Sequence, residues 1–428
     1  MTQPLRIGLA GLGTVGIGVV KILQEHAALL GKRAGRDLQL VAVNARTKGK
    51  DRGVDLSAYD WVDDPVTLAQ REDIDLFIEL IGGDEGPALD ATRAAIASGK
   101  DVVTANKAML AHHGQELAET AEEAGLCLRF EAAVAGGIPV IKALTEGLAG
   151  NQITRVMGVM NGTCNYILTK MQSENLAYDT VFEEARQLGY LEADPTLDVG
   201  GIDAGHKLAL LSAIAFGTKV DFDGVRMTGI EHVTIEDITR ADDLGYRIKL
   251  LGVAQLTGRG LEQRMSPCLV PVSSPLGQLE NATNMVVLEG DAVGQIVLRG
   301  AGAGEGPTAS AVMGDVMDIA RGLRLPVFGQ AAKSLAEMPA ASAAVPAPYY
   351  LRLSLVDKPG ALAKVATILG DNGISIDRLR QYGHAEQKAP VLIVTHKTTR
   401  ASLDAALAML PKTGVLAADP VALRIEQV

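Results

Sequence analysis

Residues 5–23 have the sequence LRIGLAGLGTVGIGVVKIL, and this stretch decides the fold of the N-terminal part of the chain. Its first six residues are mostly apolar, as in a strand that is buried on both faces. A glycine-rich turn follows at once, and the next residues predict a helix from Val15 to about Leu30. A strand, a tight turn and a helix make the first half of a βαβ unit, so the stretch predicts a parallel sheet.

The same alternation continues down the chain. LQLVAVN (38–44), a strand within DIDLFIELIGG (73–83) and DVVTAN (101–106) are the next expected strands, and GPALDATRAAIASGK (86–100) is an expected helix. Strands that alternate with helices of this length indicate a doubly wound parallel sheet of the Rossmann type. We assign residues 1–135 to this domain.

The turn has the spacing G-x-G-x-x-G at Gly11, Gly13 and Gly16. The first glycine permits the tight turn, the second lets backbone amides approach a pyrophosphate, and the third lets the helix pack on the strand. The helix N-terminus then faces the phosphate charge. The pattern therefore predicts a dinucleotide site, although a merely tight turn would also satisfy it.

The end of the second strand bears on which dinucleotide binds. NAD-specific sites usually place Asp or Glu there, to bind the ribose 2′-hydroxyl. Here the position holds Asn44, and Arg46, Lys48, Lys50 and Arg52 follow. Cationic side chains at this place favour binding of a 2′-phosphate, and hence of NADP. NAD is the other possible cofactor. Alternatively, these residues form a solvated basic loop that binds no cofactor.

Three further regions follow the first domain. Helical and alternating patterns over 136–304 predict a mixed α+β domain for substrate binding and dimerisation, and the helix within 305–330 is expected to return to the first domain. Residues 331–348 are rich in Ala, Ser and Pro, which is typical of a linker. Residues 349–428 predict a small ferredoxin-like βαββαβ unit.

Composition excludes several classes of protein. The net charge is −11 with scattered basic residues, and aromatic residues make up 4%. We therefore expect neither a nucleic-acid partner nor a membrane surface. No apolar run reaches the ~18 residues of a membrane span, and no leader is evident. The three cysteines show no disulfide or metal spacing, so we expect a cytoplasmic protein.

Two clusters of polar residues suggest chemistry. In TANKAML, Lys107 follows an expected parallel strand, beyond whose carboxyl end ligands bind; a surface lysine is the alternative. The second cluster lies in LGYLEADPTLDVGGIDAGHK (188–207) and combines one lysine with four carboxylates, at Glu192, Asp194, Asp198, Asp203 and Lys207. A helix would place Asp203 and Lys207 on one face, either as a salt-bridged helix start or as part of a substrate-binding group.

With these motifs in view, the chain resembles the homoserine dehydrogenases that carry a C-terminal ACT domain. The resemblance covers essentially the whole chain and rests on seven motifs: GLGTVG, TANKA, EAAVAGGIP, MNGTCNYIL, GYLEADPTLDVGGIDAGHK, GAGAGEGPTAS and DKPGALA. It implies NAD(P)H-dependent reduction of L-aspartate 4-semialdehyde to L-homoserine, in threonine and methionine biosynthesis. It also implies a homodimer or homotetramer, with L-threonine as the expected effector.

The resemblance assigns roles residue by residue. Lys207 matches the proposed proton donor, and Lys107 matches the second lysine near nicotinamide and substrate. The substrate-binding positions are Glu192, Asp198, Asp203, Tyr190, Gly162 and Thr163. The dinucleotide contacts, besides the three glycines of the turn and Lys107, are Thr14, Val15, Arg46, Thr104 and Gly304.

The family's sodium-type cation site would fall at Glu131 and at the backbone carbonyls of Val134, Gly136 and Ile138. From the sequence alone, Glu131 is equally an ordinary carboxylate at a strand end. The ACT domain, residues 349–428, is expected to pair with another copy and to bind the effector at the pair interface. Backbone amides of the DKPG turn would meet the effector carboxylate, which gives Asp357, Gly360 and Asn372 as effector positions. A purely structural pairing module is the alternative.

The chemistry of aldehyde reduction is consistent with this assignment. Hydride reaches the carbon, and a positioned lysine protonates or polarises the oxygen. Burial lowers the pKa of a lysine and nearby carboxylates raise it, so the sequence does not decide between the two effects. Two other functions remain to be weighed: an ACT-bearing 2-hydroxyacid dehydrogenase, which would need a His paired with an acid, and a catalytically inert amino-acid sensor.

Overall fold

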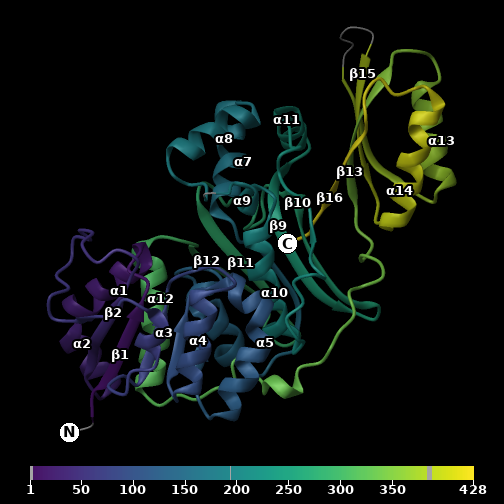
Figure 1. Cartoon of the computed structure of the whole chain (residues 1–428). Helices are drawn as coiled ribbons and strands as arrows, with labels where there is room; N and C mark the ends of the chain where they lie inside the picture. The colour runs from purple at the N-terminus through teal and green to yellow at the C-terminus, as the bar shows by residue number, and fades with distance from the viewer. Residues whose placement is uncertain (1–2, 193, 383–387) are drawn as a thin grey trace.

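A six-stranded parallel sheet in the order β3-β2-β1-β4-β5-β6 forms the N-terminal part of the computed structural model, which describes residues 3–192, 194–382 and 388–428 (Figure 1). Its strands are β1 Leu5–Ala10, β2 Leu38–Asn44, β3 Asp60–Trp61, β4 Leu76–Glu79, β5 Asp101–Thr104 and β6 Leu128–Arg129. Its helices are α1 Thr14–Glu25, α2 Ala27–Ala34, α3 Pro65–Ala69, α4 Pro87–Ala97, α5 Lys107–Glu123 and the 3-10 turn η1 Glu131–Ala133. The predicted doubly wound sheet is confirmed.

One local prediction in this part is wrong, and one strand was not predicted. The single helix expected to run to Leu30 is divided at His26 into α1 and α2, and this change of direction lets Leu30 and Ala34 join the core that already holds Leu23. The short strand β3 was missed, because two residues are too few to show a hydrophobic period.

Helix α12 (Glu305–Ala320) comes from far along the chain and packs against α1. Figure 1 shows the two helices side by side. Ala309 and Val312 share a core with the first sheet. The approach is close, because a Cβ added at Gly18 would lie 2.8 Å from the Ala309 Cβ. A small residue is therefore required on α1 for α12 to dock.

The second sheet has ten strands, in the order β12-β11-β7-β9-β10-β16-β13-β15-β14, with β8 paired to β10. The strands that the middle part of the chain contributes are β7 Ile153–Val159, β8 Arg226–Met227, β9 Tyr246–Thr257, β10 Gly260–Pro271, β11 Thr283–Gly290 and β12 Gly294–Ala301. The helices of this part are α6 Val140–Lys142, the π-helical turn η2 Ala143–Gly147, α7 Gly162–Glu174, α8 Tyr178–Gln187, α9 Thr196–Val199, α10 Ile202–Phe216 and α11 Ile235–Asp243. Helix α10 is buried between α5 and this sheet.

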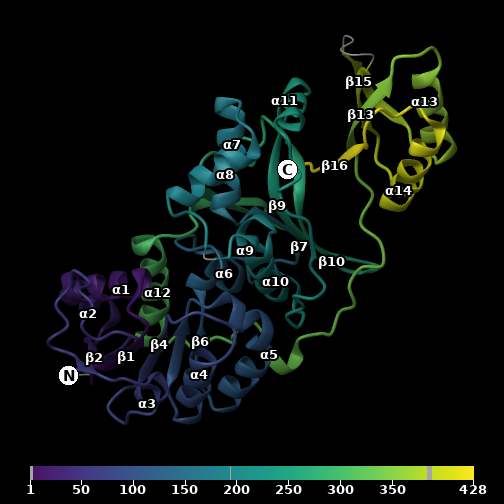
Figure 2. The same ribbon diagram turned by 45° about the horizontal axis from the view of Figure 1, so that its top comes forward.

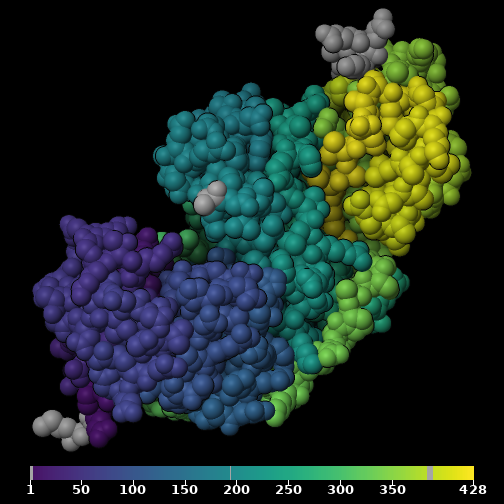
Figure 3. Space-filling view, in the orientation of Figure 1, coloured from purple at the N-terminus to yellow at the C-terminus, as the bar shows by residue number. Residues whose placement is uncertain are grey.

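The C-terminal unit has the predicted βαββαβ order. Its elements are β13 Tyr349–Val356, α13 Ala361–Asp371, β14 Ile376–Gln381, β15 Lys388–Thr395, α14 Arg400–Met409, the 3-10 turn η4 Leu410–Thr413 and β16 Val421–Ile425. The segment before it includes the 3-10 turn η3 Ala332–Ser334 and runs along the molecule to the unit, which projects from the rest of the chain (Figure 3).

The two halves of the second sheet are joined by β16, which pairs in parallel with β10 through Cys268–Arg424 and Leu269–Ile425. The C-terminus therefore lies beside β9 and β10, away from the helices of the C-terminal unit (Figures 1 and 2). A strand pattern specifies a strand but not its partner, so the sequence did not indicate this junction. Among the described residues, none of the helices has the length and apolar character needed to cross a bilayer.

Candidate active site

Lys107 is the first residue of α5 and lies just beyond the carboxyl end of β5. The Asn106 side chain caps this helix by accepting a hydrogen bond from the Met109 amide at 3.1 Å, and its own amide donates to the Gly83 carbonyl at 2.6 Å. The cap fixes where α5 begins. Lys107 is thereby held at the edge of the sheet where ligands of doubly wound folds bind.

Asp203 connects Lys107 to Lys207. Its Oδ1 lies 3.0 Å from the Lys107 Nζ, and its Oδ2 lies 2.6 Å from the Lys207 Nζ. Asp203 and Lys207 are one turn apart on α10, as the spacing predicted. Lys207 also donates to the Met160 carbonyl at 2.9 Å. The glycine before α10, Gly201, has φ +85, and a Cβ there would lie 3.0 Å from Met265.

The charges of this group shift one another's pKa values. Burial raises the pKa of Asp203, but the two lysines outweigh burial and hold that pKa well below its ordinary value. Burial lowers the pKa of Lys107, yet Asp203 and the more distant Glu192 and Asp198 raise it by more, so it ends above its ordinary value. Asp203 is therefore ionised, and Lys107 is held as an ammonium.

Asp198, at the end of α9, is buried and uses both oxygens for structure. It accepts 2.9 Å hydrogen bonds from the Asn161 side chain and from the Glu192 backbone amide. The same Asn161 amide reaches Asp203 at 3.4 Å, and its oxygen caps α7 by accepting from the Cys164 amide at 2.8 Å. Asn161 therefore connects the two acids, and Asp198 holds the segment that presents Glu192.

Glu192 is the acid of this group whose carboxylate is available to bind a ligand, because Asp198 and Asp203 are engaged with other residues. Burial raises its pKa, while Lys107 lowers it, and the result lies above the ordinary value. Tyr190, two residues earlier, is 44% exposed, and its carbonyl accepts from the Thr163 hydroxyl at 2.9 Å. Gly162 packs so closely that a Cβ would lie 2.7 Å from the Ala282 carbonyl oxygen. These predicted substrate residues lie together at the start of α7 and before α9.

The glycine turn has the geometry that its spacing predicted. Gly11 has φ +99, and a Cβ there would lie 2.2 Å from the Leu80 carbonyl oxygen. A Cβ at Gly16 would lie 2.0 Å from the Gly11 carbonyl oxygen, whereas one at Gly13 would meet no atom within 4 Å. Gly13 is thus the open position through which a pyrophosphate can approach Thr14 and Val15, in the first turn of α1.

A cleft of about 720 Å³ adjoins this turn and is lined by Arg46, Lys50 and Arg52, but not by Lys48. Arg52 donates to three backbone carbonyls, at Leu12, Lys50 and Thr47, and so stabilises its own loop. Asn44 donates to the Val62 and Asp63 carbonyls at 2.8 and 3.0 Å. Arg46 is exposed at the cleft.

Thr104 does not face this cleft. It is fully buried, and its hydroxyl donates to Glu79 Oε2 at 2.5 Å. The other oxygen of Glu79 accepts from the amides of Ile81 and Gly82, at 2.7 and 3.1 Å. Thr104 thus supports the loop after β4. Because none of its atoms is exposed, it cannot contact a dinucleotide directly.

Gly304 is the N-cap of α12, the helix that packs against α1. It has φ +116 and is exposed. The next residue, Glu305, forms a 2.7 Å ion pair with Lys21 of α1. A Cβ added at Gly18 would likewise lie 2.8 Å from the Glu305 carbonyl oxygen, so the start of α12 lies against the middle of α1.

Glu131 is buried, and its two carboxylate oxygens accept from the amides of Ile141 and Lys142 at 2.9 and 2.8 Å. It therefore caps α6. Burial, together with Asp315, raises its pKa to about 7. The Ile138 carbonyl likewise accepts from the Val140 amide at 2.8 Å. Carboxylate and carbonyl oxygens are the ligands that hard cations prefer. The oxygens of Glu131 and Ile138, however, already accept hydrogen bonds from backbone amides.

No cluster of three or more His, Cys, Asp or Glu side chains suited to a metal occurs in the described residues. The expected ligands at Val134 and Gly136 are backbone carbonyls and not side chains of these types. Gly136 has φ +57, and a Cβ there would lie 2.4 Å from the Gly302 carbonyl oxygen. The turn over these carbonyls is therefore held tightly against the loop before α12.

The three expected effector positions do not lie together within one chain. Asp357 and Gly360 are exposed before α13, whereas Asn372 follows its last residue. The eleven-residue helix between them is about 16 Å long. The Asn372 amide donates to the Ile368 carbonyl at 2.8 Å. Within one chain a single amino acid cannot touch both ends of α13, so a site that uses all three positions needs two copies of the unit.

His206 directly precedes Lys207 on α10, and it pairs with no acid in the described part of the site. Its ring packs against those of Phe222 and His112, with centroids 4.2 and 5.6 Å away. Burial and His112 lower its pKa to about 4. A neutral histidine in this setting does not support the His–acid chemistry of a 2-hydroxyacid dehydrogenase.

Sequence reasoning missed three functional supports: Asn161, the Met160 carbonyl and Glu79. Asn161 directly before a helical pattern signals a cap. Its bonds to Asp198 and Asp203, 37 and 42 residues away, leave no sequence signal.

Comparison with known protein families gives three matches along the chain. The model described as "Homoserine dehydrogenase, NAD binding domain" matches residues 11–131, "Homoserine dehydrogenase" matches 139–317, and "ACT domain" matches 349–408.

Relatives match over nearly the full length. "Homoserine dehydrogenase" from Neisseria gonorrhoeae is 43% identical, with 95% of each chain covered. The crystal structure of a homoserine dehydrogenase from Thiobacillus denitrificans superimposes with a TM-score of 0.93 at 41% identity, covering 99% of this chain and 98% of that one. A hyperthermophilic archaeal homoserine dehydrogenase in complex with NADPH gives a TM-score of 0.64 at 27% identity, covering 76% and 99%.

Proposed function

The chain belongs to the homoserine dehydrogenase family, and from this premise we propose which of its residues carry the NAD(P)-dependent interconversion of L-aspartate 4-semialdehyde and L-homoserine. The observation that carries the proposal is the single carboxylate of Asp203 held between Lys107 and Lys207. The test is direct: the purified chain, given L-homoserine and NADP or NAD, should produce reduced cofactor, seen by absorbance.

Lys207 is the proton donor of this proposal. Reduction adds a hydride at the aldehyde carbon, which the nicotinamide supplies when bound, and a proton at the oxygen. Asp203 and the Met160 carbonyl accept two of the three ammonium protons of Lys207, so the third has a fixed direction. Lys107 is held by Asp203 at the edge of the dinucleotide-binding sheet, where it polarises and positions the substrate. Lys207 delivers the proton.

The carboxylates hold the amino-acid end of the substrate. Glu192, Asp198 and Asp203 together exceed the two lysines by one negative charge, which suits a substrate ammonium. Glu192 is the direct partner, because Asp198 is committed to Asn161 and to the Glu192 amide. Tyr190, Gly162 and Thr163 border this group. The ion pair to Lys107 keeps the acids next to the dinucleotide part of the chain.

NADP is the preferred cofactor in this proposal, and NAD is used less well. Arg46 supports this preference, because it is exposed at the cleft beside the glycine turn. The Asn44 side chain is committed to backbone carbonyls and presents no carboxylate to a ribose. An arginine that binds a phosphate bidentately gives strong, charge-assisted hydrogen bonds.

A sodium ion is proposed to bind at the turn that contains Glu131, Val134, Gly136 and Ile138. Glu131 and Asp315 are both buried, and the Glu131 amide donates to Asp315 at 2.8 Å, so two acids lie close together, which supports a cation there. The ion would hold the turn through oxygen ligands and take no part in the chemistry. Raising sodium at constant ionic strength should raise the melting temperature more than potassium does.

Regulation by L-threonine, pairing of chains into a homodimer or homotetramer, and a cytoplasmic location are also proposed. The ACT domain supports an amino-acid effector. Strand β12 is an edge strand whose Val297 is 38% exposed, which supports association. The three cysteines are free and buried, which suits a reducing compartment. Light scattering measures the oligomer, and rates with and without L-threonine measure the regulation.

A further inference from the structure

A cavity of about 450 Å³ lies where the C-terminal unit meets the central part of the chain. One wall is β10 with the loop around β8, and another is formed by the start of β13 and by β16. The linker closes it through Ala340, Ala341 and Ala344. The cavity therefore exists only while the two parts are docked on each other, and none of the residues proposed for catalysis lines it.

The charges around this cavity are mainly positive. Arg226, Arg264, Arg400 and Arg424 line it, against Glu262 and Asp237. Asp237 is already paired with Arg352, and Arg264 and Glu262 are joined to each other. Two arginines retain spare donors: Arg226 has one hydrogen bond, to the Ala341 carbonyl at 3.2 Å, and Arg400 pairs only with Asp404 of its own helix, at 2.9 Å, among the described residues.

The rest of the wall is apolar with scattered polar groups. Leu261, Val233, Val421 and Leu423 give it hydrocarbon surface, and Ser266 and Gln263 add hydrogen-bonding groups. The Gln263 amide oxygen is buried and has no partner in the described part of the chain, which is unusual for a buried acceptor. A small ligand with a carboxylate, a donor group and a short apolar body matches these features better than a purely apolar ligand does.

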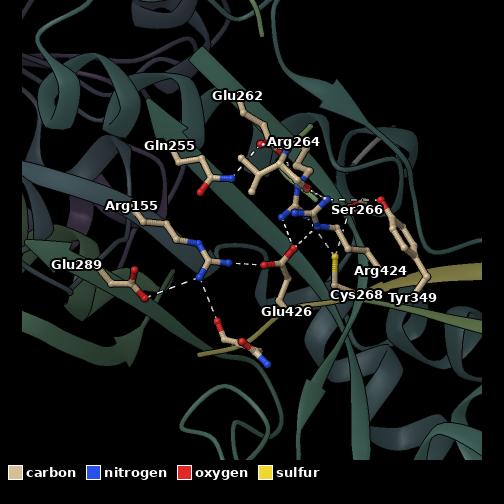
Figure 4. Close-up of polar contacts among 12 residues, drawn as sticks. Arg155, Gln255, Glu262, Arg264, Ser266, Cys268, Glu289, Tyr349, Arg424 and Glu426 are labelled. Carbon is tan, nitrogen blue, oxygen red and sulfur yellow. Dashed lines mark hydrogen bonds and ion pairs between the residues drawn. The ribbon is translucent and has the colours of Figure 1, made fainter. Parts of the chain in front are cut away.

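The cavity is also linked to the active site. Arg424 and Arg264 both donate to Glu426, which also accepts from Arg155 at the start of β7 (Figure 4). Strand β7 leads directly to Met160 and Asn161, which hold Lys207 and the acids. The cavity wall is thus connected to Lys207 by the ion pairs of Glu426 and then by the backbone of β7, which ends at the Met160 carbonyl that Lys207 contacts.

We propose that this cavity between the ACT unit and the catalytic part is the effector site, and that it takes a small amino acid whose carboxylate is bound by Arg226 and Arg400. The inference rests on the proposed amino-acid regulation and gives it a location different from the two ends of α13. Because both parts of the chain form the walls, occupancy changes the free energy of their docking.

The experiment measures binding of L-threonine, L-isoleucine and L-methionine to the full-length chain by calorimetry. Ala344→Trp fills the cavity without changing charge, and Arg400→Gln removes one cation. Arg186→Gln is the matched control, because Arg186 is also an exposed helical arginine paired within its own helix. Asn372→Ala tests the end of α13. Activity without effector is measured on every sample.

We expect at least one of the three amino acids to bind. Ala344→Trp and Arg400→Gln should each weaken that binding at least tenfold, while both control variants stay within twofold and turnover without effector is unchanged. The proposal is overturned if none of the three amino acids binds, if the cavity variants bind like the parent, or if Asn372→Ala alone abolishes binding. Absent homoserine oxidation in the parent chain would instead refute the proposed activity.

Discussion

Lys107 at the start of α5 and Asp203 in the first turn of α10 form a 3.0 Å ion pair that joins the dinucleotide-binding part of the chain to the catalytic part. Lys207 binds the other oxygen of the same carboxylate at 2.6 Å. One buried acid thereby sets the position of both ammonium groups relative to the cofactor cleft. The predictions below follow from this arrangement.

Asp203→Asn should lower kcat by roughly 10²-fold, because the two lysines lose their shared counter-charge and the Lys107 position is no longer fixed. Asp203 is the main group that raises the pKa of Lys107. Without it this pKa falls, so the high-pH limb of the kcat profile should move to lower pH. An unchanged limb in the variant would show that Lys107 does not control it.

Glu192→Gln should raise the KM for L-homoserine and leave kcat nearly unchanged, because the substrate ammonium loses a charged partner. In the parent enzyme this KM should rise as pH falls through the pKa of Glu192, which lies above its ordinary value of about 4.3. The variant should show no such rise. Steady-state kinetics from pH 5 to 8 measure this; a parallel rise in both proteins would assign the effect to another group.

Arg46→Ala should weaken NADP(H) at least tenfold more than NAD(H). A hydrogen bond to a charged group contributes about 1.5–3 kcal/mol, and only NADP carries the 2′-phosphate. Lys48→Ala is the control, since Lys48 does not line the cleft. The measurement is kcat/KM for each cofactor. Equal losses for the two cofactors would remove Arg46 from the proposed site.

Glu426→Gln should lower the free energy of unfolding by about 3–5 kcal/mol, because it leaves buried arginines without their acid. Burial raises the pKa of Glu426, but Arg264, Arg424 and Arg155 outweigh it and lower that pKa. The stabilisation is therefore full above the unfolded pKa of about 4.3 and is lost as pH falls through the lower folded value. Urea unfolding at several pH values measures this.

The control for that experiment is Glu289→Gln. Glu289 is 3.8 Å from Arg155 and 31% exposed, so its loss should cost under about 1 kcal/mol. Equal costs for the two variants would contradict the central role given to Glu426.

Parts of the fold and site that depend on neighbouring residues were predictable from the sequence. The strand, glycine turn and helix over residues 5–23 are local, and the contact of Asp203 with Lys207 follows from the helical period. The family resemblance added the roles of Lys107 and Glu192, which their spacing alone left open.

What depends on packing was not predictable. The contact of Lys107 with Asp203 requires α5 to lie against α10, and the bonds of Asn161 span about forty residues of chain. The pairing of β16 with β10 brings Glu426 to Arg264, 162 residues away. No periodicity encodes which elements meet, so these relationships emerge only from the three-dimensional structure.

The central claim is that Lys207 delivers the proton, and the kcat of Lys207→Ala tests it most directly. General acid catalysis contributes about 10²–10⁴ in rate, so kcat for the NADPH-dependent reduction of L-aspartate 4-semialdehyde should fall by that factor, with the Kd for NADPH little changed. Lys107→Ala should lose less in kcat. Near-normal turnover in Lys207→Ala, with turnover abolished in Lys107→Ala, would contradict the account and assign the proton to Lys107.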